Sequence, residues 1–192
     1  MPPQAKITRQ MLLNAVLEIT RESGFEAVNA RRIAARLGCS TRPIFTCYET
    51  MDQLKDDFLE FAFSVYTQYA EAYGRREGLA PALVFPLSYL AFAREETRLF
   101  QFLFVRDMAL DMARPADFYK EPGNVERARA FARQVGVDPE PGKELFLDLF
   151  LYTHGMAVLT ASGKMDLPAA SARAMVQRLL DALVRFAKEK AS

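Results

Sequence analysis

The sequence predicts an all-α protein of about nine helices. Apolar residues recur every three or four positions along most of the chain, and no segment has the alternation of a β-strand. With 192 residues, 51% of them hydrophobic, the chain can bury a substantial core. We predict a small N-terminal domain at residues 1–49, followed by a larger helical domain at residues 50–192.

Three short helices are predicted in the first domain. The first begins after Thr8, a suitable N-cap, and ends at Gly24. The second begins after Asn29 and ends at Gly38, barely two turns later. Ser40 is the predicted cap of the third helix. Two helices joined by so sharp a turn are typical of a helix-turn-helix arrangement.

The second domain contains the remaining helices. The spacing of Thr50 and Gln53 matches a capping box, which predicts a fourth helix that ends in the "GRREG" segment at 74–78. Residues 114–124 contain turn-forming residues and are predicted to form a loop. The other helices are predicted at about 80–94, with a bend at Pro86, and at about 95–113, 125–135, 142–162 and 168–189.

Charge is concentrated at the N-terminal end. The whole chain has a net charge of +1, whereas residues 1–48 contain seven Lys or Arg and three Glu, a local net charge of +4. This bias favours an anionic partner for the first domain.

Cysteine content and hydropathy predict a reducing, cytoplasmic location. The two cysteines, Cys39 and Cys47, are too few for a disulfide-rich secreted fold. The first ten residues have no apolar signal-like segment. The longest apolar stretch, 145–161, is short for a membrane span and contains Asp148 and His154, so no membrane association is expected.

The third predicted helix has an apolar side and a polar side. Ile44 and Tyr48 are four residues apart and are expected to pack against the preceding helices. Arginine pairs with both acceptors of guanine, threonine bonds to bases or phosphates, and apolar groups contact the thymine methyl. Pro43 is tolerated because the first turn needs no backbone donor there. The polar side and its edges consist of Thr41, Arg42, Pro43, Phe45, Thr46 and Cys47.

These features together predict a DNA-binding surface. The helix N-termini that follow Asn29 and Ser40 would present backbone amides to phosphates. A tight turn between helices also occurs in helical proteins that bind no DNA, so the shape alone does not decide the function.

The span from about Ile7 to Leu54, which includes the "ARLGCS" turn and ends in "DQL", resembles the DNA-binding domain of the tetracycline-repressor (TetR) family of bacterial regulators. The segments "LFQFLF" at 99–104 and "YTHGMA" at 152–157 resemble features of the ligand-binding half of that family. The resemblance implies a homodimeric regulator, most simply a repressor, that binds a palindromic operator and is released by a small molecule. No cofactor is expected.

The resemblance also implies particular DNA contacts. Phe45, Cys47 and Met51 stand where family members often have Tyr, His and Lys, so three phosphate-binding groups are absent. Lys6, Arg9, Arg32 and Lys55 are the candidates to replace them. The expected contacts are made by Arg31, Ser40, Thr41, Arg42, Pro43, Phe45, Thr46 and Cys47, with Lys6 and Lys55.

The helix predicted at 142–162 is apolar nearly all round and must be covered on more than one side. A second subunit could supply one cover, with this helix and the last one forming a four-helix bundle in which Gly155 permits close approach. The same apolar stripe also suits a monomer core. The predicted dimer-interface residues are Leu149, Tyr152, Met156, Val176, Leu179 and Leu183.

The middle helices are rich in aromatic residues and methionine. Such side chains suit a medium-sized, largely apolar effector, although they are equally typical of an ordinary core. His154, the only histidine, would orient the effector or bond a neighbouring carbonyl group. The predicted effector-binding residues are Tyr89, Phe92, Phe104, Met108, Met112, Phe146, Phe150 and His154.

Two other functions fit the sequence less well. A single histidine, with no HExxH motif, glycine-rich phosphate loop or CxxC pair, argues against an enzyme and against a metal site. The alternative to a regulator is a helical interaction module with weakened or lost specific DNA binding, because the usual phosphate-binding Lys and His are missing.

Overall fold

The structure is a computed structural model that describes residues 7–106 and 112–190. All regular structure in these residues is helical, and none of them forms a β-strand, so the prediction of an all-α fold is confirmed there. The chain divides into two compact units, Met1–Thr67 with Glu96–Asp107 and Gln68–Glu95 with Met108–Ser192. This division differs from the predicted boundary after residue 49, because the first unit also includes part of the long fourth helix and a later segment.

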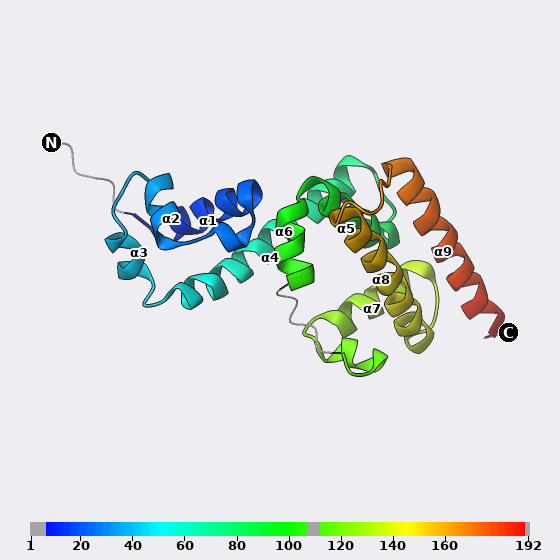
Figure 1. The fold of residues 1–192 in the computed structure, drawn as a ribbon. Helices are drawn as coiled ribbons and strands as arrows, with labels where there is room; N and C mark the ends of the chain where they lie inside the picture. The colour runs from blue at the N-terminus through cyan, green and yellow to red at the C-terminus, as the bar shows by residue number, and fades with distance from the viewer. Residues whose placement is uncertain (1–6, 107–111, 191–192) are drawn as a thin grey trace. The chain divides into compact units, whose positions relative to one another are not determined.

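The first unit begins with α1 (Arg9–Ser23), η1 (Phe25–Ala27), α2 (Ala30–Arg36) and α3 (Arg42–Cys47) (Figure 1). Thr8 caps α1 as predicted, because its hydroxyl oxygen accepts a hydrogen bond from the Met11 amide at 3.2 Å. Gly24 ends α1 with a φ of +82°, a value that favours glycine. The buried apolar side chains of these helices include Leu12, Ile19, Ile33 and Ile44.

The long helix α4 (Met51–Arg76) contributes to both units. Its first turn has a variant of the predicted capping box: Thr50 Oγ accepts from the Gln53 amide at 3.2 Å, and the Gln53 side chain reaches back to an amide before the helix. The helix continues into the predicted break at 74–78 and ends before Gly78, whose φ is +57°.

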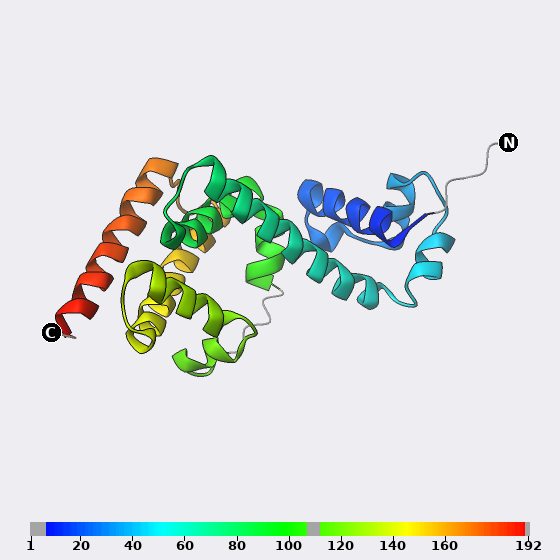
Figure 2. The ribbon, with the colours of Figure 1, turned by 180° about the vertical axis from the view of Figure 1, so that it is seen from behind.

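Four helices form most of the second unit: α5 (Pro81–Glu95), α7 (Asn124–Val135), α8 (Pro139–Ala161) and α9 (Ala169–Lys190) (Figure 2). Helix α8 packs against α5, α7 and α9. Pro86 lies inside α5 and is buried, without ending the helix. Gly142 lies so close to Ala132 that a Cβ at position 142 would collide with it, which explains the close approach of α7 and α8.

The predicted helix at 95–113 is only partly correct. A short α-helix, α6 (Thr97–Gln101), continues as a π-helical turn, η2 (Phe102–Arg106), and residues 107–111 lie outside the described part of the chain. Three consecutive side chains, those of residues 102–104, are buried in this turn. A π-helical turn changes the spacing of side chains around the helix, which simple α-periodicity does not predict.

The predicted loop at 114–124 contains a 3-10 helix, η3 (Pro115–Lys120). The buried side chain of Asp117 accepts a hydrogen bond from the Arg114 amide at 2.8 Å and pairs with Lys120 at 2.8 Å. These bonds satisfy polar groups at the start of the segment, which explains why turn-forming residues adopt regular structure here.

Candidate functional site

The turn between α2 and α3 is formed by local hydrogen bonds. Asn29 caps α2 as predicted, because its side-chain oxygen accepts from the Arg32 amide at 3.0 Å. At the other end Gly38 has a φ of +63°, and the Cys39 amide donates to the Ala34 carbonyl at 3.0 Å. These bonds satisfy carbonyl groups at the end of α2 and turn the chain towards α3.

The start of α3 differs from the prediction. The helix begins at Arg42, with Thr41 rather than Ser40 in the N-cap position. Thr41 already has helical backbone angles, with φ −73° and ψ −15°, and its side chain makes no capping bond. A side-chain cap requires an extended residue, so Thr41 does not replace the predicted cap, and Ser40 itself makes no side-chain hydrogen bond with the described residues. Pro43 lies in the first turn, as predicted.

The two sides of α3 are separated as predicted. Ile44 and Tyr48 are buried, whereas Arg42, Phe45 and Thr46 are exposed. The Phe45 ring is 51% exposed, which is unusual for a phenylalanine and leaves a large apolar group in solvent. Of the other predicted DNA-binding residues, Arg31 and Ser40 are exposed, and Thr41, Pro43, Cys47 and Lys55 are half-buried.

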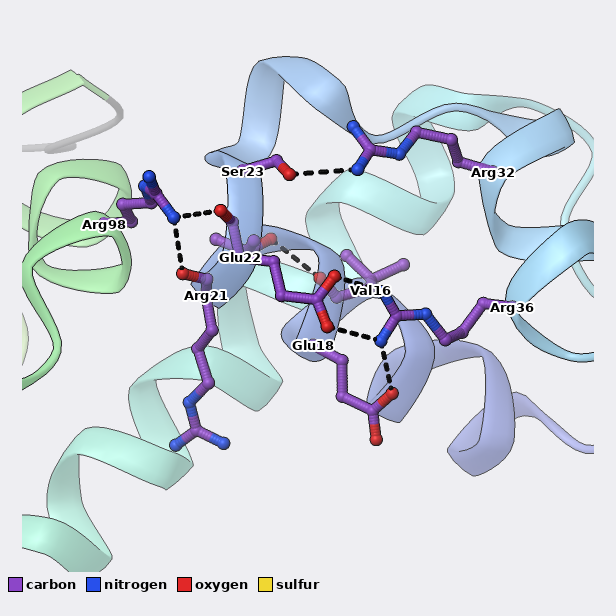
Figure 3. A network of polar contacts seen from close by, with 9 residues as sticks. Val16, Glu18, Arg21, Glu22, Ser23, Arg32, Arg36 and Arg98 are labelled. Carbon is purple, nitrogen blue, oxygen red and sulfur yellow. Dashed lines mark hydrogen bonds and ion pairs between the residues drawn. The ribbon is translucent and has the colours of Figure 1, made fainter.

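Most arginines of this region have partners within the protein (Figure 3). Arg36 of α2 donates to Glu18 at 3.0 Å and to Glu22 at 2.8 Å, both on α1. The hydrogen bond from Arg36 lowers the pKa of the Glu22 carboxyl group. Arg32 donates to the Ser23 hydroxyl oxygen at 2.9 Å. These contacts join the end of α1 to α2.

A second group of contacts joins α1 to the segment at 96–101. Arg21 forms two hydrogen bonds with the carboxylate of Glu96, at 2.6 and 2.9 Å. Arg98 donates to the backbone carbonyl groups of Arg21 and Glu22, near the C-terminus of α1 (Figure 3). A guanidinium group at that end of a helix also has a favourable interaction with the helix dipole.

Arg9, predicted as a replacement phosphate contact, instead holds the end of α3. It pairs with Asp57 at 3.3 Å, donates to the Cys47 carbonyl at 3.2 Å and lies over the Tyr48 ring, 4.9 Å from its centre. Burial raises the pKa of Tyr48 to about 12, and Asp57 adds to this shift. Lys55 lies over the Phe25 ring at 5.9 Å, and Lys6 is outside the described residues.

Two arginines differ from the rest. Arg31, in the first turn of α2, and Arg42, the first residue of α3, are both exposed. Neither makes an ion pair or hydrogen bond with any other side chain or carbonyl group that the structure describes. Both guanidinium groups are therefore exposed to solvent and unpaired within the described residues.

Four of the predicted effector-binding residues come together in the second unit. Tyr89 Oη lies 3.0 Å from His154 Nδ1, and the Phe150 ring stacks on the imidazole at 5.6 Å. Phe146 is nearby, linked to Phe150 through the ring of Phe118. His154 is half-buried, and this partial burial lowers the pKa of its imidazole, which favours the neutral form.

The remaining predicted effector residues are dispersed. Phe92 packs on Tyr69 at 5.1 Å, whereas Phe104 lies in the first unit, with its ring 5.0 Å from that of Tyr66. Met112 is half-buried, and Met108 lies outside the described residues.

The predicted dimer residues are less exposed than expected. Leu149, Met156 and Val176 are buried within their own chain, because α8 and α9 turn these positions towards the unit's core. Tyr152, Leu179 and Leu183 are half-buried. The most exposed large apolar side chains on the same helices are Leu151 and Leu159, at 47% each, and Phe186 at 56%.

Sequence reasoning missed the ion pairs of Arg21 and Arg36, whose partners are distant in sequence, and the hydrogen bonds of Arg98 to backbone carbonyl groups. No helix in the described ranges is both long and apolar enough to cross a lipid bilayer. Among the same residues, no group of three or more His, Cys, Asp or Glu side chains is placed to hold a metal ion.

Comparison with known proteins does not assign the chain to a family. No protein-family model matches the sequence, and a search of curated proteins finds no significant match.

Proposed function

We propose that this chain is a DNA-binding transcriptional regulator in which α2, the turn and α3 form a helix-turn-helix, as the resemblance to the TetR family implies. The observation that carries the proposal is the presence of two exposed guanidinium groups without described protein partners, Arg31 and Arg42, at the starts of α2 and α3. Neighbouring arginines are used within the protein, so these two are the basic groups best placed to bind an anionic partner.

The exposed side of α3 has a donor, an acceptor and an apolar group. Arg42 is proposed to donate to O6 and N7 of guanine. The Thr46 hydroxyl donates to the Arg42 carbonyl at 3.0 Å, so its oxygen remains an acceptor for a base amino group. Phe45 offers apolar surface to a thymine methyl group, and Arg31 is proposed to bind a phosphate.

We further propose that the chain acts as a homodimer and a repressor. A two-fold dimer presents two recognition helices to the half-sites of a palindrome. The exposed Leu151, Leu159 and Phe186 on α8 and α9 support a contact with a second subunit. A small molecule bound in the second unit would release the DNA by displacing α4, which is continuous and contributes to both units.

The test is selection of binding duplexes from random-sequence DNA at low salt. We expect an enriched palindrome, with log affinity falling linearly as log salt rises. Arg42→Ala should cost about 1 to 3 kcal/mol and relax the preference at one base pair per half-site. Arg31→Ala should weaken binding to all sequences. Arg178→Ala, an exposed arginine of α9, is the matched control and should bind normally.

The alternative function is a helical interaction module. It is favoured by the 51% exposed ring of Phe45, since exposed aromatic side chains often anchor protein interfaces. Selection that enriches no sequence at low salt would exclude the regulator and favour this alternative.

A further inference from the structure

The second unit contains a pocket of about 280 Å³, and none of the predicted effector-binding residues that the structure describes lines it. It is bordered by the C-terminal part of α4, by α5, by the end of α8 and by the start of α9. Leu87, Leu90 and Leu167 line it and are at most 7% exposed, so they provide a buried apolar wall. The pocket therefore has a buried apolar wall and an exposed edge, at which Glu77, Arg94 and Arg173 lie.

The charged lining residues leave this pocket positive. Among the described lining residues, Glu77 is the one carboxylate, and it pairs with Arg76 at 3.0 Å. Two arginines also line the pocket. Arg94 contacts Glu95 at 3.1 Å, whereas Arg173 makes no ion pair or hydrogen bond with any residue in the ranges that the structure describes. An exposed guanidinium beside an apolar wall suits an anionic group attached to an apolar body.

Tyr73 adds a neutral donor to the same lining. Burial raises the pKa of Tyr73, so its hydroxyl group remains protonated at neutral pH. This hydroxyl has no hydrogen-bond partner among the described residues. Two independent donors, Tyr73 and Arg173, are therefore available in one pocket.

We propose that this pocket binds a small organic carboxylate. The carboxylate accepts hydrogen bonds from Arg173 and Tyr73, and the apolar body packs against Leu87, Leu90 and Leu167. A water molecule takes up about 30 Å³ in the liquid, so the pocket has room for about ten non-hydrogen atoms. Benzoate has this size. Binding itself does not require DNA, whereas a role for this pocket as the effector site rests on the proposed function.

The experiment is an NMR titration of the ¹⁵N-labelled full chain with sodium benzoate at constant ionic strength. Benzamide is the neutral probe of the same shape, and benzylamine is the cationic one. We expect benzoate to shift the amide signals of Ala169, Ala170 and Arg173, which line the pocket, and to bind at least about ten-fold more tightly than either other probe.

Three variants locate the site. Arg173→Gln keeps a polar side chain but removes the charge, and should weaken benzoate binding by about ten-fold or more. Ala170→Phe places a ring at the exposed edge of the pocket and should also weaken binding. Arg178→Gln, an exposed position of α9 that does not line the pocket, should bind benzoate normally. Circular dichroism of each variant verifies that the helices are retained.

The proposal is overturned if benzamide or benzylamine binds as well as benzoate, if the shifted amides lie elsewhere, or if Arg173→Gln and Arg178→Gln behave alike.

The DNA-binding experiment tests the proposed function separately from the pocket. Benzoate binding without sequence-specific DNA binding would exclude the regulator and keep the pocket assignment, and the reverse result would exclude only the pocket assignment.

Discussion

Each unit has a polar junction between its helices, and the two junctions differ in charge and burial. In the first unit, Arg36 and Arg98 join α1 to α2 and to α6 through carboxylates and carbonyl groups at the surface (Figure 3). In the second unit, Tyr89 of α5 and His154 of α8 form a neutral pair among aromatic rings.

The difference determines how much each junction stabilises the fold. Exposed ion pairs contribute about 0 to 1 kcal/mol, because water competes for both partners and salt screens them. A partly buried hydrogen bond such as that between Tyr89 and His154 has a similar net value, but removal of one partner leaves the other unsatisfied where water cannot replace it, which costs about 1 to 3 kcal/mol. The contacts of Arg36 and Arg98 should therefore be lost at little cost, whereas loss of the Tyr89–His154 hydrogen bond should weaken the packing of α5 on α8 more.

The largest expected effect is that of Tyr89→Phe. This change keeps the ring, which is 2% exposed, but leaves His154 Nδ1 without the hydroxyl at 3.0 Å. We expect a loss of about 1 to 2 kcal/mol in the free energy of unfolding, measured by urea titration with far-ultraviolet circular dichroism. Tyr152→Phe is the control, because the structure describes no hydrogen bond to that half-buried tyrosine. Equal losses in the two variants would remove the distinction between the junctions.

Local features of the fold could be predicted from the sequence. The caps at Thr8 and Asn29 depend on side chains three residues from the amides that they bind. The burial of Ile44 and Tyr48 follows from their spacing. Both kinds of prediction need only the geometry of one helix and its nearest neighbour.

Features that depend on distant residues could not be predicted. Arg21 and Glu96 are 75 positions apart, and Arg98 binds carbonyl groups that have no sequence signature. The sequence predicts a DNA contact for Arg9 because its side chain is basic. It does not reveal that the fold brings Asp57, 48 positions away, next to Arg9. Likewise, helical spacing does not decide whether Leu149 or Leu151 is covered by the same chain, since both lie on an apolar helix.

The next effect is a dependence of stability on pH. Burial lowers the pKa of His154 from its ordinary value of 6.5, so the unfolded chain binds this proton more readily than the folded chain. The free energy of unfolding should therefore fall as pH decreases through 6.5 and level off below the folded pKa, with a slope no steeper than about 1.4 kcal/mol per pH unit from this group.

His154→Gln should remove this part of the pH dependence. Urea titrations of the wild type and the variant between pH 7.5 and 5 would measure it, at roughly half-unit intervals. As the only histidine, His154 can also be titrated directly by NMR. A midpoint at or above 6.5 would contradict a neutral, half-buried imidazole and would make the two junctions alike in charge.

Glu22→Gln, at the exposed junction, should have the smallest effect. The Arg36 hydrogen bond lowers the pKa of Glu22 from 4.5, so the carboxylate stabilises the fold above pH 4.5, and the contribution is lost as pH falls through the folded pKa. At pH 7 the variant should unfold at a slightly lower urea concentration than the wild type. This decrease should be smaller than the decrease caused by Tyr89→Phe, and added salt should reduce it further. Glu60→Gln, an exposed glutamate of α4 without a described partner, is the control.

Two results would contradict a charge-based role for the Arg36–Glu22 contact. One is that Glu22→Gln destabilises the chain more than Tyr89→Phe does. The other is that Glu22→Gln has the same effect below the folded pKa of Glu22 as at pH 7. In either case the contact would act through packing rather than charge. The α1–α2 contact would then be as rigid as the α5–α8 contact.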